Sequence, residues 1–169
     1  MNILFQINGG LGKCILSTAV CEAIKKKYPD SNLIVVSGYP DVFLNNPSVK
    51  KSLNFNNITY FYQDFIEDKD VKVFFHDPYL ETSYIKEEAH LIKIWCEMFD
   101  IPYNGEQPKL YFTQRELDAF QRQIVIDKPM FLLQSNGGAD ANRKYSWARD
   151  IPREVVEKVI DEFKEVFRK

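Results

Sequence analysis

The sequence has 169 residues, enough for one domain with a substantial core but too few for two complete ones. Apolar residues make up 45% and charged residues 27%, which is the balance of an ordinary globular protein and excludes a disordered chain. The net charge of −2 argues against a nucleic-acid-binding domain, because such domains usually carry a basic excess.

Cysteine usage and hydropathy give a first expectation of the compartment. Cys14, Cys21 and Cys96 are odd in number and form no Cys-x-x-Cys pair, so we expect neither a disulfide framework nor a zinc or other metal site. No basic leader is visible, and no apolar run reaches the ~18 residues of a membrane-spanning helix. We therefore expect a cytoplasmic protein without a transmembrane segment.

The first residues give the clearest local pattern. Ile3–Ile7 is a short apolar run typical of a buried strand, and a glycine-rich turn follows it. From Lys13 to Lys27 apolar residues recur at four-residue spacing, which predicts a helix. Leu33–Val36 is a second apolar run. The order strand, turn, helix, strand predicts two adjacent parallel strands with a right-handed crossover.

The middle of the chain continues this alternation. The pattern predicts a short helix over Pro40–Leu44, strands over Ile58–Tyr62 and Val71–His76, an amphipathic helix over Lys86–Phe99 and a helix over Gln114–Gln123. The fold class we expect is α/β: a Rossmann-like, doubly wound parallel sheet with helices on both faces.

A second strand–loop–helix unit closes the sequence. Met130–Leu133 is the expected strand, a long loop follows, and Pro152 opens a helix with an apolar stripe. A single strand–loop–helix unit provides too little sheet for the apolar stripe of its helix to pack against. We therefore predict a domain over residues 1–127 and, over residues 128–169, the first and incomplete unit of a second domain. The alternative is that residues 128–169 form a unit docked back on the first domain.

The glycine-rich turn has the features of an anion site. Gly9, Gly10 and Gly12 let the backbone approach a ligand, and the helix that follows presents free N–H groups with partial positive charge. Lys13 adds a full charge. Three glycines in four positions exceed what a tight turn needs, so we expect the loop to contact a ligand rather than only to reverse the chain.

One interpretation of this ligand is a nucleoside triphosphate. Asn8-Gly9-Gly10-Leu11-Gly12-Lys13-Cys14 resembles the P-loop of the ParA/MinD-type ATPases, and Asp77 follows a predicted strand. Two departures count against the resemblance. Cys14 stands where a hydroxyl residue holds Mg²⁺, and Asn8 stands where the signature lysine of that group belongs.

A second resemblance extends over more of the chain. Leu11-Gly12-Lys13, Lys26-Lys27-Tyr28-Pro29, the segment 42–49 and Pro108-Lys109-Leu110-Tyr111 are similar in order and spacing to glycosyltransferase family 9, the ADP-heptose:lipopolysaccharide heptosyltransferases and their relatives. The resemblance is dense at residues 1–50 and 100–155. It implies the N-terminal, acceptor-side half of a GT-B type glycosyltransferase and the start of its donor-side domain.

The resemblance also implies a donor site in the second unit. There the family has a glycine-bearing loop and a Lys-Arg-Trp-Pro stretch that contacts the donor phosphates. The positions of this sequence that match it are Asn136, Gly137, Gly138, Arg143, Lys144 and Trp147. Small residues, two cations and an aromatic ring before a helix suit a diphosphate and a stacked ring, although the same residues could equally be solvated or packed.

Lys13 is the main departure from the family. The family has an aspartate there, proposed as the base that activates the acceptor hydroxyl, and a lysine is better suited to holding an anion. Asp77 and His76 are the substitutes we expect, because they follow a predicted strand at the edge of the sheet where ligands bind. His76 could instead be only a turn-capping residue.

Two classes of function follow. The first is an inverting, heptosyltransferase-like enzyme that moves a sugar from a nucleoside-diphosphate donor to a glycan or other hydroxyl acceptor without a cofactor or metal. The second is a sugar- or nucleotide-binding module without turnover, which Lys13 and the short second unit favour. The P-loop ATPase is a third alternative.

Overall fold

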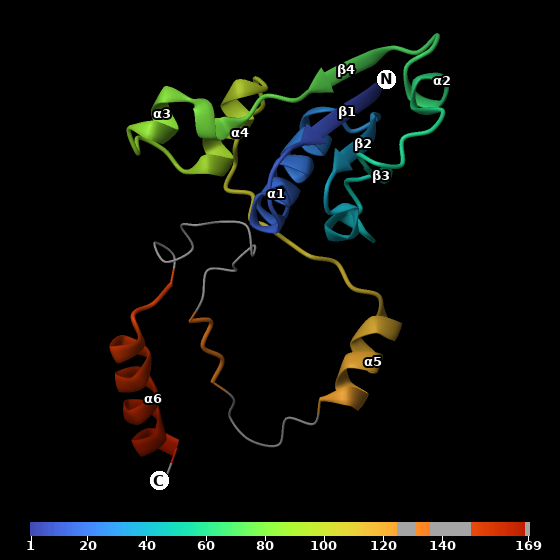
Figure 1. Ribbon diagram of the computed structural model, residues 1–169. Coiled ribbons are helices and arrows are strands. Elements are labelled where there is room, and N and C mark those ends of the chain that lie inside the picture. The colour runs from blue at the N-terminus through green and yellow to red at the C-terminus, as the bar shows by residue number, and fades with distance from the viewer. Residues whose placement is uncertain (125–130, 136–149, 168–169) are drawn as a thin grey trace. The chain divides into compact units, whose positions relative to one another are not determined.

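The computed structural model describes residues 1–124, 131–135 and 150–167 (Figure 1). The chain divides into two compact units, Met1–Gln123 and Ile124–Lys169. The expected identity of residues 128–169 as the start of a donor-side domain stays a prediction.

A parallel four-stranded sheet forms the centre of the first unit. Its order is β3-β2-β1-β4, with β1 spanning Asn2–Ile7, β2 Asn32–Ser37, β3 Lys51–Asn54 and β4 Val71–Phe74. All three pairings are parallel, and β1 pairs with β2 as the sequence predicted, with Ile3 opposite Leu33. This strand order is that of a Rossmann-like, doubly wound α/β fold.

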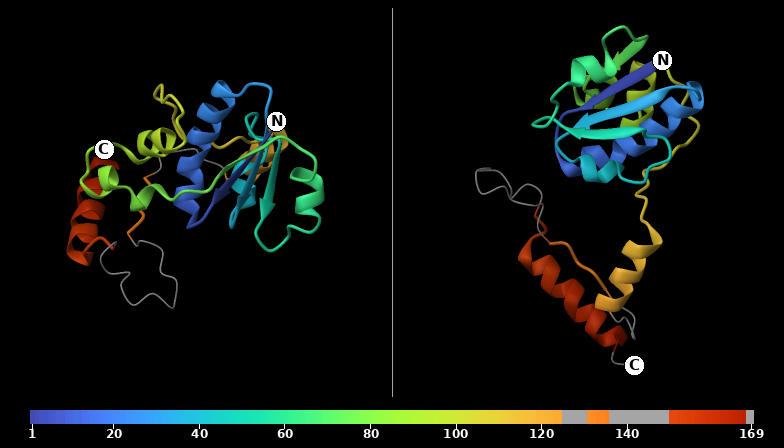
Figure 2. Two further views of the ribbon diagram at one scale, coloured as in Figure 1. Left: turned by 90° about the horizontal axis from the view of Figure 1, so that it is seen from above. Right: turned by 90° about the vertical axis from the view of Figure 1, so that its right-hand side faces the viewer.

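Two helices cover one face of this sheet. Helix α1 spans Leu11–Lys27 and α4 spans Leu91–Met98, and Figure 2 shows both on the same side of the strands. The ring of Phe5, in the middle of β1, packs edge-on against Trp95 at 5.4 Å and Phe99 at 5.5 Å between ring centroids. Burying one side chain of this size contributes about 1.5–3 kcal/mol, so these contacts fix α4 over the central strand.

The four-residue spacing in the sequence explains how α1 packs. Ala19, Val20, Ala23 and Ile24 are all buried in the core, and the small alanines let the helix lie close to the sheet. Lys25, Lys26 and Lys27 occupy the last turn, where cations interact favourably with the negative end of the helix dipole. The helix begins at Leu11, immediately after the glycine-rich turn.

The connection from β3 to β4 differs from the prediction. Residues 58–60 form a turn and α2 spans Phe61–Phe65, so the strand expected over Ile58–Tyr62 is wrong. Asn54 accepts hydrogen bonds from the amides of Asn56 and Asn57, which starts a turn, and Tyr60 has a φ of +60°. Local side-chain bonding therefore overrides the β-propensity of the aromatic residues.

The helix expected over Lys86–Phe99 is also wrong in its first part. A short helix α3 spans Thr82–Ile85 and ends where Glu87 adopts a φ of +57°. The amide of Glu88 donates to the carbonyl of Ser83, a bond typical of a helix that ends on a left-handed residue. Helix α4 then starts afresh, with His90 accepting a hydrogen bond from the Ile92 amide.

The other predicted elements of the first unit are formed. A 3₁₀ turn, η1, spans Pro40–Phe43, and α5 spans Gln114–Gln123 with the predicted bounds. The strand predicted over Val71–His76 is shorter and ends at Phe74. A second 3₁₀ turn, η2, spans Pro78–Leu80.

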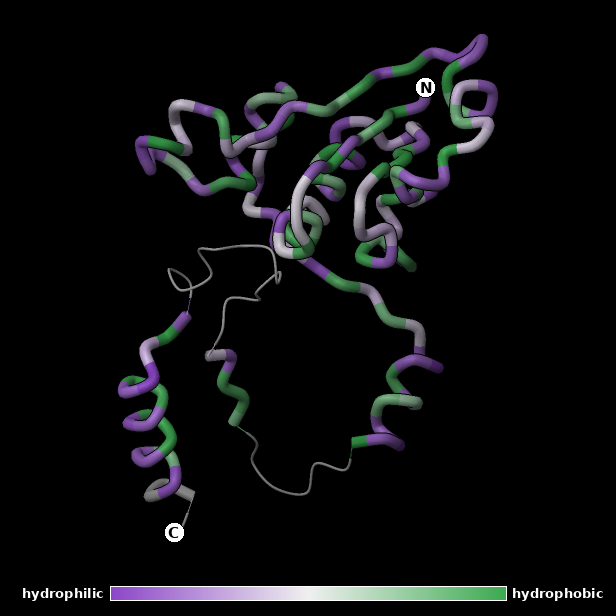
Figure 3. The backbone as a smooth tube through the Cα atoms, in the orientation of Figure 1, coloured by the Kyte–Doolittle hydropathy of each residue, from purple (hydrophilic) through white to green (hydrophobic). Residues whose placement is uncertain are grey.

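In the second unit the described residues form one helix. Helix α6 spans Arg153–Phe167 directly after Pro152, as predicted, and its hydrophobic residues gather along one side (Figure 3). The ring of Phe131 stacks on Phe163 of α6 at 3.9 Å. Residues 131–135 form no strand, so the strand expected over Met130–Leu133 is not formed in its described part.

Candidate functional site

The strand order places a topological switch point between β1 and β4. The chain runs from β1 through α1 to β2 on one side, while β4 pairs with the other side of β1. In open parallel sheets, ligands bind outside the carboxyl ends of the strands at such a switch point. Here the segments that leave those two ends are the glycine-rich turn after Ile7 and residues 75–77 after Phe74.

The three glycines of the turn have different roles. Gly9 has a φ of +119°, and a Cβ there would meet Cδ of Lys13 at 3.0 Å, so the turn itself requires this glycine. Gly10 precedes α1 with ordinary backbone angles, and Gly12 lies in the first helical turn. A Cβ at either position would have open space around it. No packing requirement of the first unit therefore accounts for Gly10 and Gly12.

The start of α1 is open to an incoming anion. No side chain caps the helix at Gly10, and its first turn holds no acidic residue. Helix N-termini with uncapped N–H groups attract negative charge. The first charged side chain along the helix is that of Lys13.

Lys13 and Asp77 form an ion pair at this point. The Lys13 Nζ lies 2.7 Å from Asp77 Oδ1, and the lysine is 7% exposed while the Asp77 side chain is 37% exposed. Asp77 also accepts a hydrogen bond from the Tyr79 amide at 3.1 Å, which holds it at the start of η2. The Lys13 ammonium further lies 5.2 Å from the centroid of the Tyr79 ring and 5.5 Å from that of Trp95.

The structure thus brings two of the three predicted catalytic residues together. His76 is exposed, and its ring stacks on that of Phe75 at 4.6 Å instead of reaching the pair. Cys14, next along α1, is buried in the core, and burial raises the pKa of its thiol. The predicted donor-site residues Asn136, Gly137, Gly138, Arg143, Lys144 and Trp147 lie outside the described residues.

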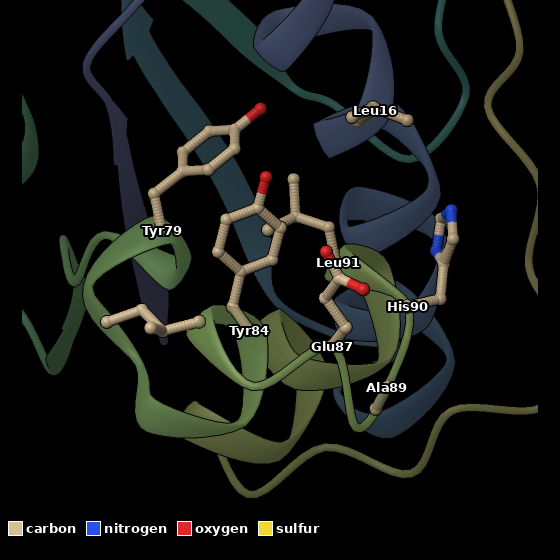
Figure 4. A pocket seen from close by; sticks show the side chains of 8 residues that line it. Leu16, Tyr79, Tyr84, Glu87, Ala89, His90 and Leu91 are labelled. Carbon is tan, nitrogen blue, oxygen red and sulfur yellow. The ribbon is translucent and has the colours of Figure 1, made fainter.

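A pocket of about 690 Å³ adjoins the ion pair (Figure 4). It is lined by Leu16, Tyr79, Tyr84, Ile85, Glu87, Ala89, His90 and Leu91. Tyr79 connects the pocket to the pair because its ring also contacts Lys13, and Leu16 lies one turn after Lys13 on α1. A volume of this size is typical of small-molecule sites.

The sequence did not single out these pocket residues. Apart from Leu16 of α1 and Leu91 of α4, they come from η2, α3 and the segment between α3 and α4. The periodicity had assigned only the last of these segments to a helix, Lys86–Phe99. The density of aromatic residues after β4, at Phe75, Tyr79 and Tyr84, is the signal that could have pointed to a binding surface.

Two further properties of the described residues are relevant to the class of site. Within 1–124, 131–135 and 150–167, no group of three His, Cys, Asp or Glu side chains is placed to hold a metal ion. Over the same residues, no helix is long and apolar enough to cross a membrane.

Comparisons with known proteins found one distant structural likeness. No family model and no curated protein matches the sequence. Among solved structures, the chain is similar to a glycosyl transferase of family 9 from Veillonella parvula, with 11% identity and a TM-score of 0.46. The match covers 72% of this chain and 49% of that one, so the chain spans about half of that protein's length. Because this likeness is too distant to assign an activity, we base the proposed function on the residues at the switch point.

Proposed function

We propose that the first unit is the acceptor-side part of a glycosyltransferase that takes a sugar from a nucleoside diphosphate. The observation that carries the proposal is the Lys13–Asp77 pair at the switch point, 2.7 Å apart beside an uncapped helix N-terminus. The resemblance of the sequence to family 9 supports the same reaction and favours a heptose as the sugar.

The chemistry needs two groups of opposite character, and the pair supplies both. The acceptor hydroxyl oxygen attacks the anomeric carbon of the donor, the bond from that carbon to the diphosphate oxygen breaks, and the hydroxyl proton must leave. Asp77 is the carboxylate that takes this proton. Lys13 and the N–H groups of α1 stabilise the negative charge that develops on the diphosphate.

The pair also implies an order of events. The Lys13 ammonium is bonded to Oδ1 of Asp77, so each group of the pair engages the other. A diphosphate that draws the ammonium toward itself releases an Asp77 oxygen for the acceptor hydroxyl. In this proposal, donor binding therefore precedes proton transfer.

The test is titration of the full chain with ADP, UDP, GDP and ATP, each with and without Mg²⁺. We expect a nucleoside diphosphate to bind without Mg²⁺ and Lys13→Met to weaken it by about 10- to 150-fold, because a charge-assisted hydrogen bond contributes about 1.5–3 kcal/mol. Lys93→Met removes an exposed lysine of α4 and is the matched control. Asp77→Asn should retain binding and lose about 10²–10⁴ in transfer rate.

The outcomes separate the competing functions. If the chain binds a nucleoside diphosphate but releases no nucleotide from any donor sugar, it is a binding module without turnover. The bond between Lys13 and Asp77 is compatible with such a module. Mg²⁺-dependent ATP binding that disappears in Lys13→Met would replace the transferase with an ATPase. The structure gives that alternative little support, because the buried Cys14 thiol lies where a P-loop protein needs an exposed hydroxyl.

A further inference from the structure

The pocket beside Lys13 lacks positive charge. Among the eight described residues that line it there is no lysine or arginine, and Glu87 is the one carboxylate. Lys13 contacts the Tyr79 ring, but its ammonium is already bonded to Asp77. A phosphate or carboxylate placed in this pocket would meet the Glu87 charge without a cation of its own, which is unfavourable.

The walls of the pocket combine aromatic rings with aliphatic side chains. Tyr79 and Tyr84 meet edge to face, with ring centroids 4.9 Å apart and planes at 88°. Leu16 and Leu91 add apolar surface from α1 and α4. Figure 4 shows the two tyrosine hydroxyl groups pointing in the same direction. A ligand with an apolar face and polar edges matches this lining.

Hydrogen-bonding groups of both kinds lie at the rim. The Nδ1 atom of His90 accepts from the Ile92 amide at 3.3 Å, so in the neutral ring Nε2 carries the proton and can donate. The Glu87 carboxylate supplies two acceptor oxygens. Glu87 is held at a φ of +57°, a left-handed conformation that costs a non-glycine residue about 1–2 kcal/mol. Neighbouring hydroxyl groups on one ring are recognised by such a donor and acceptor together.

We propose that this pocket binds an uncharged sugar ring of the acceptor and excludes phosphorylated or acidic sugars. That this sugar belongs to the acceptor rests on the proposed function. The inference goes further, because it states that the bound sugar carries no charge. Tyr84 packs against the ring face, while Glu87 and His90 hydrogen-bond its hydroxyl groups. The volume of about 690 Å³ leaves room for more than one ring.

The experiment is saturation-transfer NMR on the full chain without any nucleotide. The neutral probes are the methyl glycosides of glucose, galactose and mannose together with lactose, and the charged probes are glucose 6-phosphate and glucuronic acid. We expect at least one neutral probe to bind and both charged probes to bind at least tenfold more weakly. Glucosamine is added to detect a site selective for cations.

Variants tie the binding to the pocket. Tyr84→Ala should weaken binding of the neutral probe at least tenfold, and Glu87→Gln should weaken it several-fold. Glu87→Gln should also reduce the ratio between the affinities for the neutral probe and for glucuronic acid. Glu88→Gln and Tyr62→Ala change exposed residues outside the pocket and serve as controls.

Three results would overturn the inference: binding of a charged probe as tight as the neutral ones, binding of glucosamine alone, or no binding of any neutral probe. Because no nucleotide is present, the result is independent of the nucleotide titration. If a neutral sugar binds and no nucleotide does, the pocket is a sugar site and the proposed transferase function is refuted. If a nucleotide binds and no neutral sugar does, only the assignment of the pocket is refuted.

Discussion

Lys13 and Asp77 show what single residues reveal before a structure is known. Both follow strands of a parallel sheet, and the carboxyl ends of neighbouring parallel strands lie at one edge, so their proximity could be expected from the order of the elements. The 2.7 Å ion pair between them could not be expected from the sequence, because it depends on how η2 places the Asp77 side chain. His76 is adjacent to Asp77 in sequence, yet its ring stacks on that of Phe75 at 4.6 Å and takes no part in the pair.

Substitutions in the glycine-rich turn separate a structural from a binding role. Gly9→Ala should lower the free energy of unfolding by about 1–3 kcal/mol, because its φ of +119° strains any residue with a Cβ. Gly10→Ala should change it by less than about 0.5 kcal/mol, and Gly12→Ala should raise it by up to about 1 kcal/mol, since alanine favours a helix and meets no neighbour. Urea denaturation measures all three.

The same variants test the ligand. Gly10→Ala and Gly12→Ala place a methyl group over the start of α1 and should weaken binding of the nucleoside diphosphate in spite of their unimpaired stability. If both bind it as tightly as the parent chain, the glycines only shape the turn and α1 does not hold the anion.

At the scale of elements, predictions succeeded where apolar periodicity decided the structure. The first 36 residues were predicted closely because the apolar residues of their two strands and their helix form the buried core. Strand β3, Lys51–Asn54, was missed because its side chains are polar or half-buried and give no apolar run. The helix predicted from Lys86 starts only at Leu91, because its start depends on a left-handed Glu87 and on capping by His90, which is not a typical capping residue.

A network of charges joins α1 to the segment around residue 106. The Glu106 side chain is fully buried, with Lys26 Nζ at 3.0 Å and the Asn104 amide donating at 2.8 Å. Burial alone raises the pKa of Glu106, but the hydrogen bonds from Asn104 and Lys26 together lower it more, so the net pKa is below its usual value. Hydrogen bonds from Lys109 and Lys26 also lower the pKa of Glu22.

The direction of these pKa shifts determines how the stability of the folded chain changes at low pH. A carboxyl whose pKa is lower in the folded chain stabilises it fully above the unfolded value of about 4.3, and this stability is lost as the pH falls through the folded pKa. Glu106→Gln should therefore lower the free energy of unfolding at pH 7 by about 1–3 kcal/mol, with the difference shrinking as the pH falls below about 4.

Denaturation with urea at pH 7, 5, 4 and 3 measures this difference. Glu97→Gln is the control, because Glu97 is an exposed residue of α4 with a single lysine partner at 3.7 Å, and it should change stability little at any pH. A Glu106→Gln difference that stays constant from pH 7 to pH 3 would contradict the role assigned to the network.

For the molecule as a whole, the distribution of the core is the informative feature. The cluster of buried residues that holds the sheet and its helices extends from Ile3 to Ile101, with Tyr103 packed against it. The Lys13–Asp77 pair and the neutral-sugar pocket lie within the same stretch. The first unit therefore contains both its own core and its proposed acceptor site.

A fragment of residues 1–123 should consequently fold by itself. We expect a cooperative thermal transition, an ordered near-ultraviolet circular dichroism signal from the buried Trp95, and a Tm within about 5 °C of the full chain, equivalent to about 1 kcal/mol for a domain of this size. The fragment should also bind the neutral sugar as the full chain does. Its control is a fragment of residues 30–123, which lacks the central strand β1 and the helix α1 and should not fold, because β2 and β4 both pair with β1. A non-cooperative transition of the 1–123 fragment, with loss of the tryptophan signal, would mean that residues 124–169 are needed to complete the core.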